Sequence, residues 1–117
     1  MPTNPSDGTD ADPSDIGRRQ SLFREVNERI EELAKGFDLQ ERLPILCECG
    51  SDDCHARIEL TQAEYETVRA VATRFAVLPG HEIPEVERVV ARNERYLVVE
   101  KIGPAARAAA DLDPRQG

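Results

Sequence analysis

Cys47-Glu48-Cys49-Gly50-Ser51-Asp52-Asp53-Cys54-His55 contains all three cysteines of the chain and one of its two histidines. Structural zinc sites hold the metal with four Cys or His ligands in a tetrahedron. Gly50 gives the backbone the freedom to turn directly after Cys49. The spacing Cys-x-Cys-x4-Cys therefore predicts three sulfurs around one metal ion.

The fourth ligand must come from elsewhere, and the sequence leaves several candidates: His55, His81, Asp52, Asp53 or a group from another molecule. Consecutive residues of a strand point to opposite faces, so His55 should face away from a metal that Cys54 binds. His81 lies in a Pro79-Gly80-His81 turn that can reach a neighbouring hairpin. We expect His81 rather than His55 to complete the set of Cys47, Cys49, Cys54 and His81.

Free thiols are the alternative interpretation, because an unligated cysteine behaves as a small buried hydrophobe. The clustering of all three cysteines within eight residues argues against it. A chain of 117 residues with three Phe, two Tyr and no Trp also has little to build a core from. Small domains of this kind often gain stability from a structural metal.

Upstream of the cysteines, apolar residues recur at steps of three and four, which predicts a helix over about 18–36. Gly36 is a suitable stop. We expect the apolar stripe to face the core; it consists of Leu22, Phe23, Val26, Ile30, Leu33 and Phe37.

Downstream, the pattern predicts strands at 45–47, 56–60, 75–78 and 96–102. Thr61 and Glu64 have the spacing of a capping box, which predicts a helix over about 62–72. Pro84 followed by acidic residues predicts a third, short helix ending near Asn93. The expected order is α-β-β-α-β-α-β, a small α+β domain with a mixed or antiparallel sheet clasped by the metal site.

The two ends differ in composition from this domain, which we place at 17–102. Residues 1–16 are rich in Pro, Ser and Asp and are expected to be a disordered acidic tail. Residues 103–117 are rich in Ala and Pro, and a short helix can begin at Pro104. We expect this segment to be a frayed tail or a small docking segment.

The formal net charge of −8 disfavours nucleic-acid binding, which needs a basic face, and permits a basic protein partner. No apolar run has the length of a membrane span, and the first residues do not have the pattern of a secretory signal. Clustered cysteines in an odd number fit a reducing compartment, so a cytoplasmic protein is expected. The oligomeric state stays open.

Two resemblances are present. Cys47–Cys54 resembles the post-SET zinc motif, Cys-x-Cys-Gly-x-x-x-Cys, over eight residues only, which implies zinc but no methyl transfer. More broadly, Leu22–Ile30, the cysteine cluster, Leu60–Tyr65, Val77–His81 and Val98–Lys101 are similar to a group of small uncharacterised actinobacterial proteins with Cys-Glu-Cys-x4-Cys and Pro-Gly-His pieces. That likeness favours His81 as a ligand and implies no activity.

These features predict a non-enzymatic module with a structural Cys3His site for Zn²⁺, which binds a protein partner or regulates one. The sequence leaves open whether zinc or iron occupies the site. The main alternative is a thiol-based sensor that releases its metal on oxidation. A small zinc enzyme is less expected, because the sequence contains no His-Glu-x-x-His, deaminase or nucleophile-elbow motif.

Overall fold

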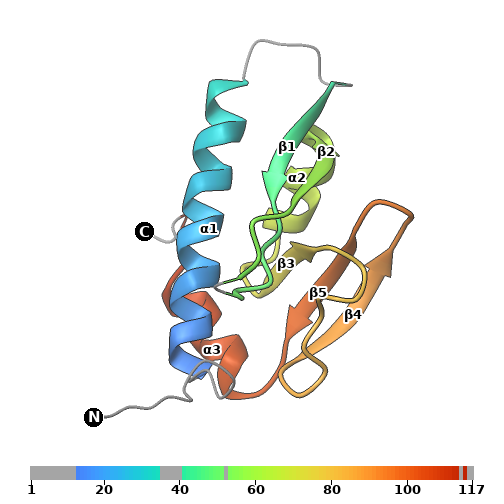
Figure 1. Cartoon of the computed structure of the whole chain (residues 1–117). Helices are drawn as coiled ribbons and strands as arrows, with labels where there is room; N and C mark the ends of the chain where they lie inside the picture. The colour runs from blue at the N-terminus through green and yellow to red at the C-terminus, as the bar shows by residue number, and fades with distance from the viewer. Residues whose placement is uncertain (1–12, 35–40, 52, 114, 116–117) are drawn as a thin grey trace.

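The computed structural model describes residues 13–34, 41–51, 53–113 and 115 (Figure 1). Its elements in chain order are α1 (Pro13–Leu33), β1 (Arg42–Leu46), β2 (Arg57–Thr61), α2 (Gln62–Arg69), β3 (Arg74–Val77), β4 (Glu87–Arg92), β5 (Leu97–Lys101) and α3 (Pro104–Asp111). The α+β class is confirmed. In the described residues, no helix combines the length and apolar character that a bilayer crossing requires.

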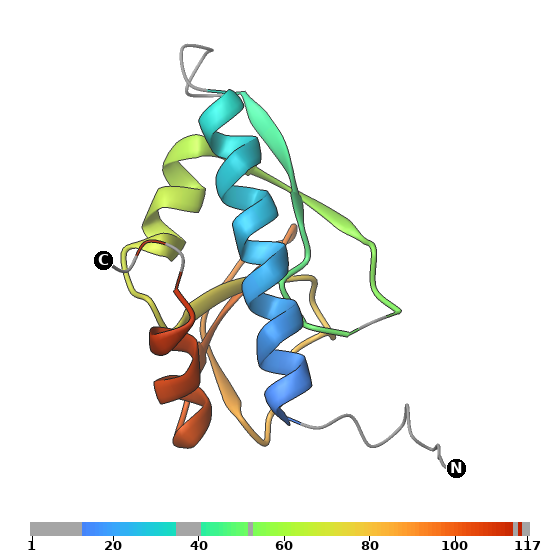
Figure 2. The same cartoon turned by 90° about the vertical axis from the view of Figure 1, so that its left-hand side faces the viewer.

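The strands form two antiparallel sheets. β1 and β2 make a hairpin, and β3, β5 and β4 make a three-stranded sheet with β5 in the centre. α1 runs along the molecule, with the hairpin beside its C-terminal half and α3 beside its N-terminal half (Figures 1 and 2). The segment that follows β1 thus lies between α1 and the three-stranded sheet.

The predicted third helix is wrong, since most of 84–93 forms strand β4. A single turn does form after Pro84, where the backbone N–H of Glu87 donates to the carbonyl of Ile83 at 2.9 Å. The chain then extends and pairs with β5, with a register shift between Val89 and Ala91. β-Branched valines suit a half-buried strand, and short apolar runs do not distinguish the two periodicities. The observed order is α-β-β-α-β-β-β-α.

α1 differs from its prediction both in its start and in its buried face. The helix begins at Pro13, within the segment expected to be a tail, and Phe37 lies outside the described residues. Three residues of the stripe expected in the core are in solvent: the exposed fractions of Leu22, Val26 and Leu33 are 55%, 39% and 73%. Phe23 and Ile30 are half-buried, and Ile30 packs against the core as expected. Among the described side chains of α1, the fully buried ones are all polar: Gln20, Arg24, Asn27 and Glu31.

Unpaired backbone groups at the end of β1 explain this inversion. The side-chain amide of Asn27 donates to the carbonyl of Leu46 at 3.0 Å and accepts from the Leu46 N–H at 2.8 Å. Gln20 donates to the carbonyl of Glu48 at 3.1 Å, and Arg19 donates to that of Gly50 at 2.6 Å. Buried backbone N–H and C=O groups must form hydrogen bonds. Here side chains of α1 supply these hydrogen bonds, in the position that a neighbouring strand would otherwise occupy.

The remaining elements follow the sequence more closely. Thr61 and Glu64 form the predicted capping box, with hydrogen bonds of 3.1 and 2.8 Å, and α2 ends at Arg69 rather than near 72. Tyr65 is fully buried in a core cluster with Ile45 and Leu60. The alanine-rich C-terminal segment forms α3, which packs against α1 and β5.

Candidate metal centre

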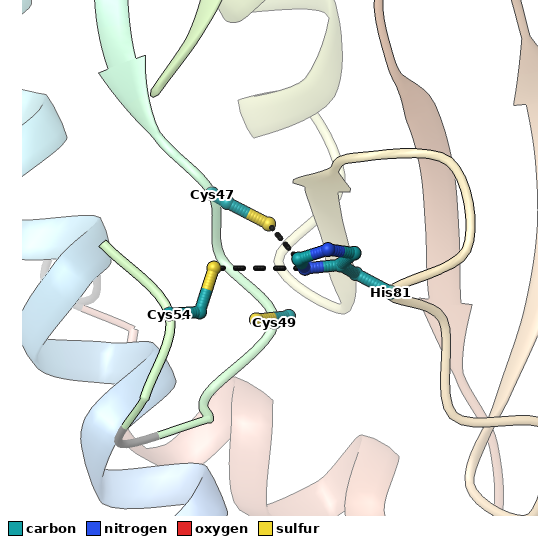
Figure 3. Close-up of side chains that lie close together, drawn as sticks. All are labelled: Cys47, Cys49, Cys54 and His81. Carbon is teal, nitrogen blue, oxygen red and sulfur yellow. Dashed lines mark hydrogen bonds between the residues drawn. The ribbon is translucent and has the colours of Figure 1, made fainter. Parts of the chain in front are cut away.

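Four side chains from three segments of the chain meet beside β3 (Figure 3). The Sγ atoms of Cys47, Cys49 and Cys54 and a ring nitrogen of His81 all lie within 4.8 Å of one another. His81 Nδ1 is 3.7 Å from Cys47 Sγ and 3.5 Å from Cys54 Sγ. The structure therefore brings together the four residues that the sequence singled out, and the group can hold a metal ion.

The two sulfur–nitrogen distances at His81 fit a single four-coordinate metal. With metal–sulfur bonds of about 2.3 Å and metal–nitrogen bonds of about 2.0–2.1 Å, a tetrahedron separates sulfur from nitrogen by roughly 3.6 Å. The two distances from His81 Nδ1 lie on either side of that value. A neutral imidazole and three cysteine sulfurs are also the donors that structural sites use.

The turn after Cys49 is held against α1. Cys47 extends the hairpin, since its N–H donates to the carbonyl of Ala56 at 2.9 Å. Gly50 then adopts a φ of +80°, and a Cβ atom there would lie 2.9 Å from the backbone oxygen of Ile16. A side chain at position 50 would therefore push the loop away from α1. Gly50 serves both the turn and this close approach.

The fourth side chain comes from the turn after β3. The N–H of His81 donates to the carbonyl of Leu78 at 2.9 Å. Gly80 has a φ of +92°, a backbone conformation that residues with a side chain rarely adopt. This turn projects His81 toward the hairpin loop (Figure 3). His55, the sequence's alternative, is exposed and lies outside the group of four. Asp53 is also exposed, and Asp52 lies outside the described residues.

Backbone N–H groups donate to the sulfurs. The N–H of Leu78 donates to Cys47 Sγ at 3.2 Å, and those of Ser51 and Ala56 stabilise the thiolates of Cys49 and Cys54. A hydrogen bond from Cys47 lowers the pKa of Cys49 to about 4, while the same contact raises the pKa of Cys47. Burial also raises the pKa of Cys54, so in the absence of a metal the thiolate charge is concentrated on Cys49, where a cation would neutralise it.

Glu48, between the two buried cysteines, is a central residue that sequence reasoning missed. Its side chain is fully buried, and its carboxylate accepts hydrogen bonds from three groups: Asn27 Nδ2 at 2.9 Å, the Ala76 N–H at 3.0 Å and the Tyr65 hydroxyl at 3.2 Å. The alternation of side chains in an extended Cys-Glu-Cys segment was the available signal, because it directs the middle residue away from the sulfurs.

Burial raises the pKa of Glu48, and the nearby guanidinium of Arg24 opposes this shift. Arg24 is itself 1% exposed and lies 3.7 Å from the centre of the Phe75 ring. Its terminal amino groups donate to the carbonyls of Ala72 and Arg74. The segment Cys47–Cys49 therefore has the cluster of sulfurs and His81 on one side. On the other side, hydrogen bonds to the buried Glu48 carboxylate hold it in place.

We compared the chain with models of protein families, with curated proteins and with solved structures, and no match was found in any of the three comparisons. The chemistry of the chain's own residues is the basis of the functional argument that follows.

Proposed function

We propose that the chain is a non-enzymatic protein-interaction module in which Cys47, Cys49, Cys54 and His81 hold a structural Zn²⁺. The observation that carries this proposal is the meeting of three sulfurs and one imidazole nitrogen within 4.8 Å. Zinc accepts this sulfur-rich tetrahedral set, and four protein ligands leave no position for the water that catalytic zinc needs. The metal links the hairpin loop to the turn after β3 and so stabilises the fold.

The proposed partner presents an arginine-bearing basic segment, and an acidic hollow beside α1 supports this part. The hollow has a volume of about 280 Å³ and is lined by Glu28, Glu31, Glu32, Glu66 and the chain's own Arg115. Arg115 donates to Glu28 at 2.7 Å, to Glu66 at 2.6 Å and to Glu31 at 3.1 Å. Carboxylates arranged around a guanidinium form the geometry that recognises arginine.

Two arginines contact the carboxylates of this hollow, since the buried Arg69 also pairs with Glu28, and they leave Glu31 incompletely matched. Burial, together with the neighbouring Glu66, raises the pKa of Glu31 to about 7 despite the presence of Arg115. The Oε2 atom of Glu31 has no hydrogen-bond partner among the described residues. A further guanidinium, or one that replaces Arg115, would satisfy these groups. We therefore assign the hollow as the docking point for the partner, with Arg115 as an internal competitor.

Binding of two synthetic peptides, Gly-Gly-Arg-Arg-Gly-Gly and Gly-Gly-Glu-Glu-Gly-Gly, to the zinc-loaded full chain tests this assignment. Only the arginine peptide should bind, with chemical-shift changes at Glu28, Glu31 and Glu66. Arg115→Ala should tighten binding several-fold, because it removes the competitor, and Glu66→Gln should weaken it. Glu59→Gln, on the exposed face of β2, is the matched control. Equal binding of both peptides, or no effect of Arg115→Ala, contradicts the assignment.

A thiol-based sensor is the second candidate, and the unequal burial of the cysteines bears on it. Cys54 is half-buried and offers an oxidant a point of attack, whereas Cys47 and Cys49 are 1% and 4% exposed. Oxidation follows accessibility and thiolate character. Because two of the three cysteines are buried, we expect stoichiometric peroxide to leave most of the zinc in place. Rapid zinc release coupled to a change in peptide binding would instead favour the sensor.

A further inference from the structure

A cavity of about 650 Å³ lies between α1, α3 and the three-stranded sheet. It shares no lining residue with the metal centre or with the acidic hollow. Most of its wall is apolar and includes Ile16, Phe75, Ile83, Val86, Ile102 and Leu112. The cavity is therefore a separate feature that neither the metal nor the proposed docking of a basic segment uses.

The composition of α3 explains why the space is there. Ala105, Ala108 and Ala109 line the cavity, and their short side chains leave the space between α3 and α1 unfilled. Protein interiors are normally packed with few voids larger than a water molecule. Cavities of roughly 300–1,000 Å³ with mostly apolar walls and a few polar groups are typical of small-molecule sites. The size and lining of this cavity match that class.

Three buried polar side chains interrupt the apolar wall: Gln20, Arg24 and Lys101, which are 2%, 1% and 5% exposed. Lys101 is neutralised, because its Nζ lies 2.5 Å from a Glu87 carboxylate oxygen. Gln20 donates to the same oxygen at 3.2 Å. The charge of Lys101 is thus already matched within the fold.

Arg24 is matched less completely. Its two terminal amino groups donate to backbone carbonyls, and its Nε has no hydrogen-bond partner within the described part of the chain. The charge of Arg24 is opposed by Glu48 and by Asp113, but neither carboxylate accepts from Nε: Asp113 is 4.0 Å from a terminal amino group and already pairs with Arg69. A buried donor without a partner costs free energy that a ligand acceptor would recover. Arg24, in the wall of the cavity, therefore holds an unpaired N–H donor on a cationic group, which suits a carboxylate head group.

We propose that this cavity binds an amphipathic monocarboxylate, with an aliphatic chain against the alanines of α3 and the carboxylate directed toward Arg24. Apolar walls favour the chain, since removing hydrocarbon from water is favourable. Glu85, which also lines the cavity and is exposed, disfavours a second negative charge on the ligand. The site accordingly selects a monoanion over a dicarboxylate of the same length.

Calorimetric titration of the zinc-loaded full chain with decanoate, decanol and decanedioate, all below micelle-forming concentrations, tests the proposal. Decanoate should bind one per chain and at least tenfold more tightly than decanol or decanedioate. Amide chemical shifts should change at α3 and near Phe75. Equal affinity for decanol and decanoate, or no saturable binding of decanoate, would overturn it.

A pair of substitutions on α3 locates the site. Ala108→Leu places a larger side chain in the cavity and should weaken decanoate binding at least tenfold. Ala106→Leu, on the same helix but outside the cavity lining, should leave the affinity unchanged. Thermal unfolding of both variants checks that the fold is kept. Equal decanoate affinity in the two folded variants would place the binding elsewhere and contradict the proposal.

Discussion

The two sides of the segment Cys47-Glu48-Cys49 differ in the interactions that fix the segment in the fold. On one side the two sulfurs join Cys54 and His81 in a group that can hold a metal. On the other, the Glu48 carboxylate accepts hydrogen bonds from α1, α2 and β3. In our proposal the first side relies on a bound ion, whereas the second relies on the hydrogen bonds that pair a buried carboxylate. Removing the metal and the Glu48 carboxylate in separate variants should show how much each contributes to stability.

The largest effect is expected from loss of the metal. Metal binding contributes on the order of 10 kcal/mol in small zinc domains, which is comparable to the whole stability of a domain, about 5–15 kcal/mol. Cys49→Ser, or removal of metal by a chelator, should therefore abolish the cooperative thermal unfolding transition. His55→Ala is the control and should keep both the metal and the transition. Cooperative unfolding of metal-free Cys49→Ser at the wild-type temperature would show that the sulfur side is dispensable.

The next effect is expected on the carboxylate side. Glu48→Gln keeps the volume but places an amide N–H₂ among groups that donate to the carboxylate, and it leaves Arg24 without its charge partner. We expect a loss of about 3 kcal/mol in the free energy of unfolding, with the metal content unchanged. Denaturant unfolding and metal analysis measure the two quantities. Glu59→Gln, on the exposed face of β2, should change the stability by less than about 0.5 kcal/mol.

A smaller effect is expected where the turn after Cys49 contacts α1. Gly50→Ala places a methyl group 2.7 Å from Gln20 Cγ and 2.9 Å from the Ile16 backbone oxygen. It should cost about 3 kcal/mol at most, since positive φ and the close contact both oppose it. Gly80→Ala has a similar φ but no atom within 4 Å, so about 1 kcal/mol is expected. Equal losses in the two variants would mean that the contact with α1 is unimportant.

The smallest effect is expected on the outer face of α1. Leu22→Ser and Leu33→Ser should each change the free energy of unfolding by less than about 0.5 kcal/mol, because both side chains are in solvent. Ile45→Ala, in the core, should cost about 2–5 kcal/mol. Denaturant unfolding of the three variants provides the check. A core-sized loss in Leu22→Ser would restore the orientation that the sequence pattern predicted.

A structural feature could be predicted from the sequence where the residues that determine it lie close together in the chain. The sulfur ligands and the capping box at Thr61 are set by residues close together in the chain, so their spacing alone identifies them. The buried face of α1 depends on unpaired backbone groups at Leu46, Glu48 and Gly50, which periodicity does not register. Strand β4 was missed because a short valine-rich run fits both periods, and pairing with β5 decides between them.

X-ray absorption spectroscopy on the purified full chain, combined with metal analysis, tests the central claim most directly. We predict one zinc per chain, with three sulfurs at about 2.3 Å and one nitrogen at about 2.0–2.1 Å. His81→Ala should exchange the nitrogen for an oxygen, whereas His55→Ala should leave the spectrum unchanged. A chain that contains no metal, or a wild-type site in which water completes the coordination, would contradict the assignment of Cys47, Cys49, Cys54 and His81 as a closed structural centre.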